Sequence, residues 1–154
     1  MKDSLTDMPK DLQFLYVCGK NNSDDLHLFD SQENVFVVPY VDTLKIYAHI
    51  DGMICRAGAT TIAELTGLGI PSIMIPSPYV ANNHQYYNAK VLVDQKAAFM
   101  IEEKDLNATN LKKAIKELFM NEEMMKQVHQ NALRLGKPDA AYDIIDEMVK
   151  LIKE

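Results

Sequence analysis

The sequence predicts an α/β fold with a doubly wound parallel sheet and a helical C-terminal tail. Five short apolar runs recur along the chain, and stretches with a helical apolar repeat separate the later runs. The runs are almost continuously apolar, which is typical of parallel strands covered on both faces. The chain has 154 residues, of which 47% are hydrophobic and 25% charged, the ordinary balance of one domain with its own core. We therefore expect a single domain over residues 1–154.

Five strands are expected at the five apolar runs. They cover residues 13–18 (QFLYVC), 35–39 (VFVVP), 50–55 (IDGMIC), 72–76 (SIMIP) and 97–101 (AAFMI). Helical patterns are found between the later runs, at residues 43–49, 60–68 and 84–95. Because strands that alternate with helices become parallel neighbours, the predicted architecture is Rossmann-like.

Three further amphipathic stretches follow the last predicted strand and should form helices. Their apolar residues at helical spacing are Leu111, Ala114, Ile115, Leu118 and Phe119, then Met124, Met125, Val128 and Ala132, and finally Ala141, Ile144, Ile145, Met148, Val149 and Ile152. Gly136 and Pro138 separate the last two helices. The final helix, residues 140–153, has its apolar stripe opposite a charged face. Exposure of this stripe would favour either a homodimer through this helix or a refolded tail.

Charge and cysteine content exclude several kinds of partner. The formal net charge is -6, from 22 acidic and 16 basic residues, so we expect no nucleic-acid partner. Cys18 and Cys55 each end an apolar run and are expected to be buried, reduced thiols, as in a cytoplasmic protein. No apolar segment approaches the roughly 20 residues that span a bilayer, so any membrane contact should be peripheral.

A polar stretch, residues 55–65 (CRAGATTIAEL), follows the third predicted strand and opens a helical pattern. Open parallel sheets bind ligands beyond the carboxyl ends of their strands, where amides at the start of the next helix point outward. Gly58 would let a ligand approach the backbone, and the hydroxyls of Thr60 and Thr61 could hold phosphate or sugar oxygens. Glu64 could accept hydrogen bonds from two vicinal hydroxyls. Thr61 and Glu64 equally fit a capping box, which needs no ligand.

A second polar loop, residues 75–89 (IPSPYVANNHQYYNA), also joins a predicted strand to a predicted helix. His84 and Gln85 fall in the first turn of that helix and are candidate ligand groups. Taken alone, His84 fits a solvated loop histidine better than a binding residue. Neighbouring parallel strands bring their carboxyl ends to one crevice, so the two loops together favour a binding site.

These loops resemble the nucleotide-sugar glycosyltransferases of the two-domain GT-B type. The matching positions, in order and approximate spacing, are Gly58, Thr61, Glu64, Gly69, Pro71, Pro76, Gln85, Asn88 and Ala89. The chain is similar to the MurG family, whose bacterial members add N-acetylglucosamine to lipid I to make lipid II, over roughly four fifths of its length. The resemblance implies a domain that binds UDP-N-acetylglucosamine, an inverting transfer, and no cofactor or protein-held metal.

The resemblance also implies which residues contact the donor. Besides Gly58, which lets the ligand approach, these are Val41 (uracil, through its backbone), Leu44 (near the base), Ala59, Thr60 and Thr61 (diphosphate), Glu64 (ribose hydroxyls), and His84 and Gln85 (sugar hydroxyls). Arg56 precedes Gly58 as an arginine does in that family, where it helps to order the site. A structural ion pair of Arg56 with Asp51 or Glu64 is an equally good explanation.

Two parts of the family pattern have no counterpart in this sequence. The relatives begin the domain with another strand and a glycine-rich turn that contacts the diphosphate, and they carry an N-terminal domain that binds the lipid acceptor and provides the general base. We therefore expect this chain to be a donor-binding half, inactive alone and without a catalytic residue of its own. The additional strand would lie between residues 13–18 and 50–55. We expect this gap to close, giving strand order 2-1-3-4-5.

Three functions are open at this point. The first is the donor-binding half of a transferase that makes lipid II from undecaprenyl-diphospho-muramoyl-pentapeptide (lipid I), at the inner face of the cell membrane. The second is a UDP-N-acetylglucosamine 2-epimerase, although those enzymes usually have paired glycines and glutamates where this chain has single Gly58 and Glu64. The third is a non-catalytic donor-binding subunit that acts with a separate acceptor-binding chain.

Overall fold

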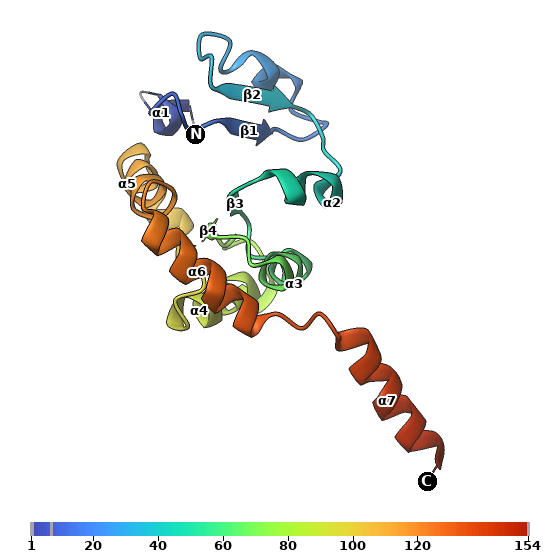
Figure 1. Ribbon diagram of the computed structural model, residues 1–154. Coiled ribbons are helices and arrows are strands. Elements are labelled where there is room, and N and C mark those ends of the chain that lie inside the picture. Colours follow the sequence, from blue (N-terminus) through green and yellow to red (C-terminus); the bar gives the residue numbers. More distant parts are fainter. Residues whose placement is uncertain (1, 7, 154) are drawn as a thin grey trace.

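The computed structural model describes residues 2–6 and 8–153 and has the predicted elements in the predicted order (Figure 1). The strands are β1 (Phe14–Val17), β2 (Val35–Val38), β3 (Met53–Cys55), β4 (Ser72–Met74) and β5 (Phe99–Met100). The α-helices are α1 (Lys2–Leu5), α2 (Thr43–Ile46), α3 (Ala59–Leu68), α4 (His84–Asp94), α5 (Ala108–Phe119), α6 (Glu122–Leu135) and α7 (Ala140–Lys153). The 3-10 helices are η1 (Ser23–His27), η2 (Tyr47–His49), η3 (Ala81–Asn83) and η4 (Glu103–Asp105). All predicted strands and helices are confirmed, with small differences at their ends.

The five strands form two separate parallel sheets. In one, β1 pairs with β2, from Phe14 opposite Val35 to Val17 opposite Val38. In the other, the order is β3-β4-β5, with β4 in the centre. Within the described residues, no strand pairing joins β1 to β3. The parallel α/β class is confirmed, but the prediction that the gap closes into one sheet of order 2-1-3-4-5 is wrong.

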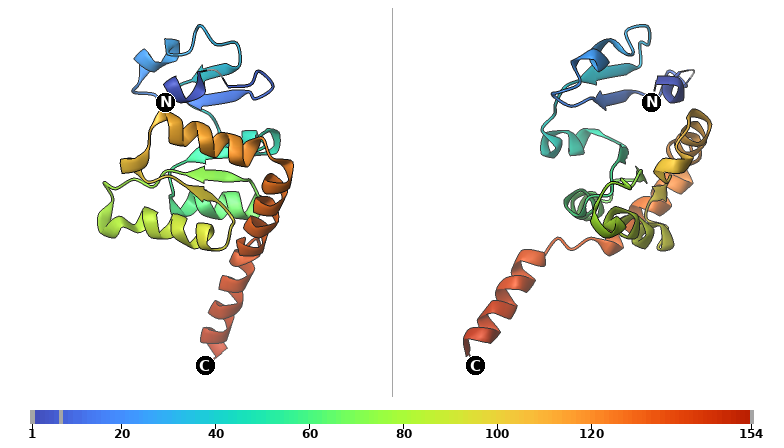
Figure 2. Two further views of the ribbon diagram at one scale, coloured as in Figure 1. Left: turned by 90° about the vertical axis from the view of Figure 1, so that its left-hand side faces the viewer. Right: turned by 180° about the vertical axis from the view of Figure 1, so that it is seen from behind.

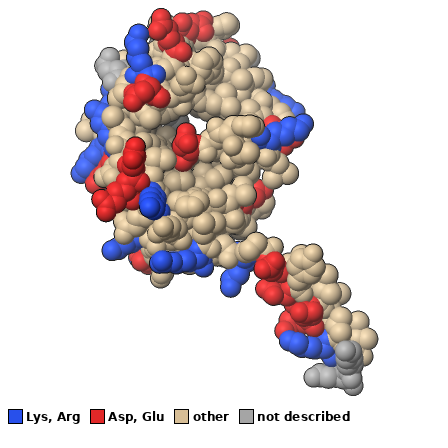
Figure 3. All heavy atoms as spheres, viewed as in Figure 1, with Lys and Arg blue, Asp and Glu red and all other residues tan. Residues whose placement is uncertain are grey.

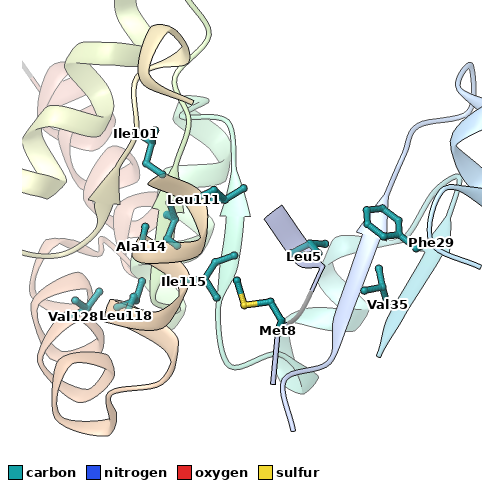
Figure 4. Close-up of a cluster of buried hydrophobic side chains, with 11 residues drawn as sticks. Leu5, Met8, Phe29, Val35, Ile101, Leu111, Ala114, Ile115, Leu118 and Val128 are labelled. Atoms are coloured by element: carbon teal, nitrogen blue, oxygen red, sulfur yellow. The ribbon is translucent and has the colours of Figure 1, made fainter. Parts of the chain in front are cut away.

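Side chains of the N-terminal segment join the β1–β2 pair to the rest of the molecule (Figure 4). Leu5 and Met8, from the N-terminal segment, lie between Ile115 of α5 and Val35 of β2, and all four side chains are buried. The β1–β2 pair is thus attached through apolar side-chain packing against α5, and not through strand pairing. Figure 3 shows a hollow in the surface between the β1–β2 unit (residues 2–6 and 8–38) and the rest of the molecule.

Helices cover both faces of the three-stranded sheet (Figure 2). On one face, Ile115 of α5 packs in the same cluster as Ile73 of β4. On the other face, Leu65 of α3 and Leu92 of α4 pack with Met74. Both β4 side chains are fully buried, as predicted for a central parallel strand. This sheet and its helices hold both polar loops singled out in the sequence.

The β1–β2 pair is covered on one face only. Leu15, Val17 and Phe36 are exposed on the other face, and Phe36 is 55% exposed. The prediction that all strands are covered on both faces is therefore wrong for this pair. The physical reason is that the connection from β1 to β2 contains the short η1 in place of a long helix that could cover the second face.

Helix α7 projects away from the body of the molecule after residues 136–139 (Figures 1 and 2). Its apolar stripe is exposed, with Ile152 the most exposed at 81%. Among the described residues, none of the helices is both long and apolar enough to cross a membrane.

Candidate functional site

The start of α3, at the carboxyl end of β3, is the centre of the candidate ligand site. Gly58 is the N-terminal cap, and the first helical hydrogen bond runs from the Ile62 amide to the Gly58 carbonyl (2.9 Å). The amides of Ala59, Thr60 and Thr61 precede this bond and have no acceptor within the helix. The side chains of Ala59 and Thr60 are exposed. The helix start therefore offers free donors and a partial positive charge, a combination that suits a diphosphate.

Glu64 lies further along α3 and does not belong to a capping box. Because Gly58 is the cap, Thr61 already lies inside the first turn, and the capping-box alternative is wrong. The half-buried Glu64 carboxylate instead accepts a hydrogen bond at Oε2 from the Tyr47 hydroxyl (2.6 Å). No second bond, to Oε1, is found among the described residues. One carboxylate oxygen is thus held by the protein while the other has no protein partner.

Tyr47 belongs to η2, which follows α2 in the connection from β2 to β3. Its side chain is only 7% exposed. Burial, and then the hydrogen bond to Glu64, raise the pKa of Tyr47 to about 12. The hydroxyl is therefore protonated at neutral pH and acts as a stable donor to the carboxylate. The bond ties the segment after β2 to α3.

Val41 and Leu44, the residues predicted to lie near the nucleobase, belong to this same segment. Val41 is half-buried in the turn after β2, and Leu44 lies in the first turn of α2 with 71% of its surface exposed. No residue of α2 is buried, so the apolar surface of Leu44 is available to pack against a ligand. The Tyr47–Glu64 hydrogen bond joins this segment to the helix that carries the predicted ribose contact.

Arg56 connects the carboxyl ends of three strands. Its guanidinium donates to the Ile75 carbonyl after β4 (3.1 Å) and forms an ion pair with Glu103 after β5. The hydrogen bond from Arg56 lowers the pKa of Glu103. Arg56 is thus a structural residue with a partner other than the predicted Asp51 or Glu64. The family role of ordering the site is compatible with this contact, because Arg56 fixes the loop directly before Gly58.

The loop between β4 and α4 has a constrained backbone directly before His84. Asn82 and Asn83 both adopt left-handed conformations, with φ of 54° and 51°, which asparagine tolerates better than most residues. His84 then opens α4, and its Nδ1 lies 2.9 Å from the Ala81 carbonyl. A carbonyl only accepts, so Nδ1 carries a proton in this contact. His84 is exposed at the start of α4, where a sugar hydroxyl could reach it.

Two hydrogen bonds hold α4 against the loops of the site. The side-chain oxygen of Gln85 accepts from the Ser77 amide (2.9 Å), which closes the β4–α4 loop on itself. The side-chain amide of Asn88 donates to the Ala57 carbonyl (3.2 Å) and joins α4 to the loop before α3. The two polar loops predicted from the sequence are therefore linked to each other. Gln85 has a structural bond through its oxygen, and its NH₂ group is the part that could address a ligand.

A cavity of about 390 Å³ lies beside the β4–α4 loop, with Pro76, Pro78 and Asn83 of that loop in its lining. Tyr79, Tyr86, Glu102 and Glu103 are among its lining residues. None of the residues predicted to contact the donor belongs to its described lining.

Two residues of this arrangement were not predicted from the sequence, namely Tyr47 as a partner of Glu64 and Glu103 as a partner of Arg56. A signal for Tyr47 existed, because a tyrosine inside an apolar helical pattern usually needs a partner for its hydroxyl. No comparable signal marks Glu103, which lies 47 positions away from Arg56 in the chain.

The sequence matches the glycosyltransferase family 28 C-terminal domain over residues 1–148. It is 42% identical to a UDP-N-acetylglucosamine–N-acetylmuramyl-(pentapeptide) pyrophosphoryl-undecaprenol N-acetylglucosamine transferase of Thermoanaerobacter sp. (strain X514), over 99% of this chain and 43% of that protein. It is 41% identical to the transferase of the same name from Bacillus cytotoxicus, over 94% of this chain and 41% of that protein. The chain thus spans less than half the length of these curated relatives.

Solved structures support the same assignment. The crystal structure of Acinetobacter baumannii MurG matches with a TM-score of 0.80 and 26% identity, over 97% of this chain and 46% of that one. The glycosyltransferase VinC, solved in complex with DTDP, shares the fold, with a TM-score of 0.74 and 16% identity over 99% of this chain and 37% of that one. With the family match covering nearly all of its residues, the chain belongs to the glycosyltransferase family 28 C-terminal domain family.

Proposed function

We propose that this chain binds UDP-N-acetylglucosamine as the donor-binding part of a transferase that delivers N-acetylglucosamine to undecaprenyl-diphospho-muramoyl-pentapeptide (lipid I). The names of the relatives that are 41% and 42% identical to it support this donor and acceptor. They favour a transferase over a 2-epimerase. Because the chain covers less than half of those relatives, transfer would also need an acceptor-binding part.

One observation supports the proposal most directly: α3 has free backbone amides in its first turn and, further along, a carboxylate, that of Glu64, which is fixed by a hydrogen bond. The amides of Ala59, Thr60 and Thr61 suit the diphosphate, with Gly58 allowing close approach. Glu64 follows Ala59 by five positions, which is about 7.5 Å along the helix axis. In the proposal, Glu64 accepts from the ribose while the helix start holds the phosphates.

The remaining donor contacts follow from the same placement. In the proposal the Val41 backbone meets the uracil, Leu44 packs near the base, and His84 and Gln85 contact the sugar. During transfer, UDP is the leaving group, and fixed amides at a helix start stabilise the charge that develops on its diphosphate. A general base must come within about 3 Å of the attacking hydroxyl. No described residue is assigned that role, so it would belong to the acceptor-binding part.

Substitution of Glu64 tests the proposal. In a chemical-shift titration of the 154-residue chain with UDP, we expect roughly millimolar affinity for the wild type and a loss of about 1.5–3 kcal/mol in Glu64→Ala, because the ribose loses a charged acceptor. Glu117→Ala, which removes an exposed glutamate of α5, is the matched control and should bind as the wild type does. Unchanged UDP affinity in Glu64→Ala, with an unchanged melting temperature, would exclude this site.

Activity and location are further parts of the proposal. We expect no transfer to a lipid acceptor by this chain alone, which a turnover assay with UDP-N-acetylglucosamine and lipid I would check. The whole enzyme is proposed to act in the cytoplasm, peripherally at the inner face of the membrane where its acceptor lies. Measurable turnover by residues 1–154 would reveal a base and an acceptor site within them.

A further inference from the structure

We infer that Tyr47 is a positioning residue for the nucleotide, because its hydroxyl fixes the Glu64 carboxylate so that the second oxygen faces the ribose hydroxyls. The inference rests on the proposed function and extends it to a residue that touches no ligand itself. It concerns the hydroxyl of Tyr47 alone, not the packing of its ring.

The geometry of the pair supports this role. The Tyr47 hydroxyl donates to Oε2 of Glu64 at 2.6 Å, a short bond of the kind that a charged acceptor forms. The ring is 7% exposed, so its position is set by packing against the second core cluster, which includes Ala57 and Leu65. Glu64 is half-buried, and within the described part of the chain this tyrosine is the hydrogen-bond partner of its side chain. A rigid donor thus fixes an otherwise flexible acceptor.

A fixed carboxylate matters because ordering a long side chain opposes binding. A free glutamate loses rotamer freedom when it engages a ligand, at a cost of up to about 1.5 kcal/mol. Tyr47 removes that freedom before the nucleotide arrives. Tyr47 takes one of the two acceptor sites of Oε2, whereas Oε1 keeps both of its acceptor sites for the two vicinal hydroxyls.

Tyr47 also lies next to the predicted nucleobase contacts in the chain. It directly follows α2, whose first turn contains Leu44. The Tyr47–Glu64 hydrogen bond therefore connects the segment near the base to the residue near the ribose, and a ligand contacting both would find their relative position already set.

The experiment measures affinities of the 154-residue chain for two probes, UDP and its 2′,3′-dideoxy analogue, which lacks both ribose hydroxyls. The variants are Tyr47→Phe, Glu64→Ala and the double variant, with melting temperatures recorded for each. Tyr16→Phe is the matched control, because the Tyr16 hydroxyl also donates to a carboxylate, that of Asp25 (3.3 Å), but on the β1–β2 unit. Tyr47→Phe keeps the ring and removes only the oxygen.

We expect Tyr47→Phe to weaken UDP binding about three- to tenfold and to leave binding of the dideoxy analogue nearly unchanged. The melting temperature should fall modestly, because a hydrogen bond to a half-buried carboxylate is lost. The weakening should disappear in the Glu64→Ala background, and Tyr16→Phe should behave as the wild type. Equal weakening for both probes, or no weakening for UDP, would overturn the positioning role while a weakened Glu64→Ala upholds the donor site. If Glu64→Ala itself binds UDP like the wild type, both the donor site and the role of Tyr47 fail.

Discussion

Gly69 ends α3 in a conformation that other residues rarely adopt. Its φ is 68°, in the left-handed region, and the Ile70 amide beyond it donates to the Leu65 carbonyl (2.9 Å), which closes the helix end. A Cβ added at Gly69 would lie 2.6 Å from Nδ1 of His129 and 2.7 Å from Cγ of Leu133. Both the backbone angle and the packing against α6 therefore require glycine here.

Alanine at Gly69 should destabilise the protein. We expect Gly69→Ala to lower the free energy of unfolding by about 1–3 kcal/mol, from left-handed strain and crowding together. Gly67→Ala is the matched control two positions earlier, where an added Cβ meets nothing within 4 Å and the helical backbone suits alanine. The free energy of unfolding of Gly67→Ala should rise by about 0.5–1 kcal/mol. Urea unfolding followed by circular dichroism measures both, and equal effects of the two substitutions would contradict this account.

The raised pKa of Tyr47 predicts a loss of stability at alkaline pH. The folded value is about 12, against an ordinary value of 10.0, so folding favours the protonated hydroxyl. The protonated hydroxyl contributes at most about 2–3 kcal/mol to the free energy of unfolding. This contribution is complete below pH 10 and is lost as pH rises through about 12. The stability difference between wild type and Tyr47→Phe should therefore shrink between pH 9 and 11, by roughly 1 kcal/mol. Tyr79→Phe, at an exposed site, should show the pH dependence of the wild type.

At the scale of elements, the sequence was informative wherever local patterns decide the structure. The apolar run of β4 and the helical repeats of α3 and α5 predicted their elements closely, because burial on both faces or along one stripe leaves a periodic signal. The short α1 and η1 lack such a repeat and were not predicted. The failure of β1 to pair with β3 was also not predictable from pattern, because strand pairing depends on how segments far apart in the chain pack, as Leu5 and Met8 pack against α5.

In the candidate site, too, local features could be predicted from the sequence, whereas contacts between distant residues could not. The start of α3 and the first turn of α4 could be predicted because glycine, threonine and asparagine at strand ends mark helix starts. The hydrogen-bond and ion-pair partners of individual side chains could not be predicted. Glu64 meets Tyr47 across 17 positions and Arg56 meets Glu103 across 47, and such contacts are set by how the elements pack.

The N-terminal cap of α6 provides a prediction for a single element. The side-chain oxygen of Asn121 accepts from the Met124 amide (3.0 Å). Asn121→Ala should lower the free energy of unfolding by about 1 kcal/mol, because that amide loses its acceptor. Asn121→Ser retains a capping oxygen, so its free energy of unfolding should stay within about 0.3 kcal/mol of the wild-type value in the same urea titration. Equal losses in both variants would mean that the cap is not what stabilises the helix start.

At the scale of the whole molecule, the exposed stripe of α7 predicts self-association. We expect sedimentation equilibrium to show a dimer, because pairing would remove Ile145 and Met148 from water. Ile145→Asp with Met148→Asp should restore a monomer. The matched double variant Asp146→Asn with Glu147→Gln changes only charged positions and should still dimerise. A wild type that remains monomeric across a broad concentration series would contradict the dimer.

The separation of the two sheets also has a mechanical consequence. Under a stretching force, parallel strands resist shear because several hydrogen bonds must break together, whereas apolar side-chain contacts give way one after another. Within the described residues, the β1–β2 unit is joined to the three-stranded sheet by the chain after β2 and by the cluster around Met8 and Ile115, with no strand pairing between the sheets. A molecule held at residue 14 and at residue 119 in an optical trap should therefore extend first by detachment of the β1–β2 unit at low force. The sheet that carries α3 would stay intact to a higher force, so the proposed nucleotide site would survive the first rupture.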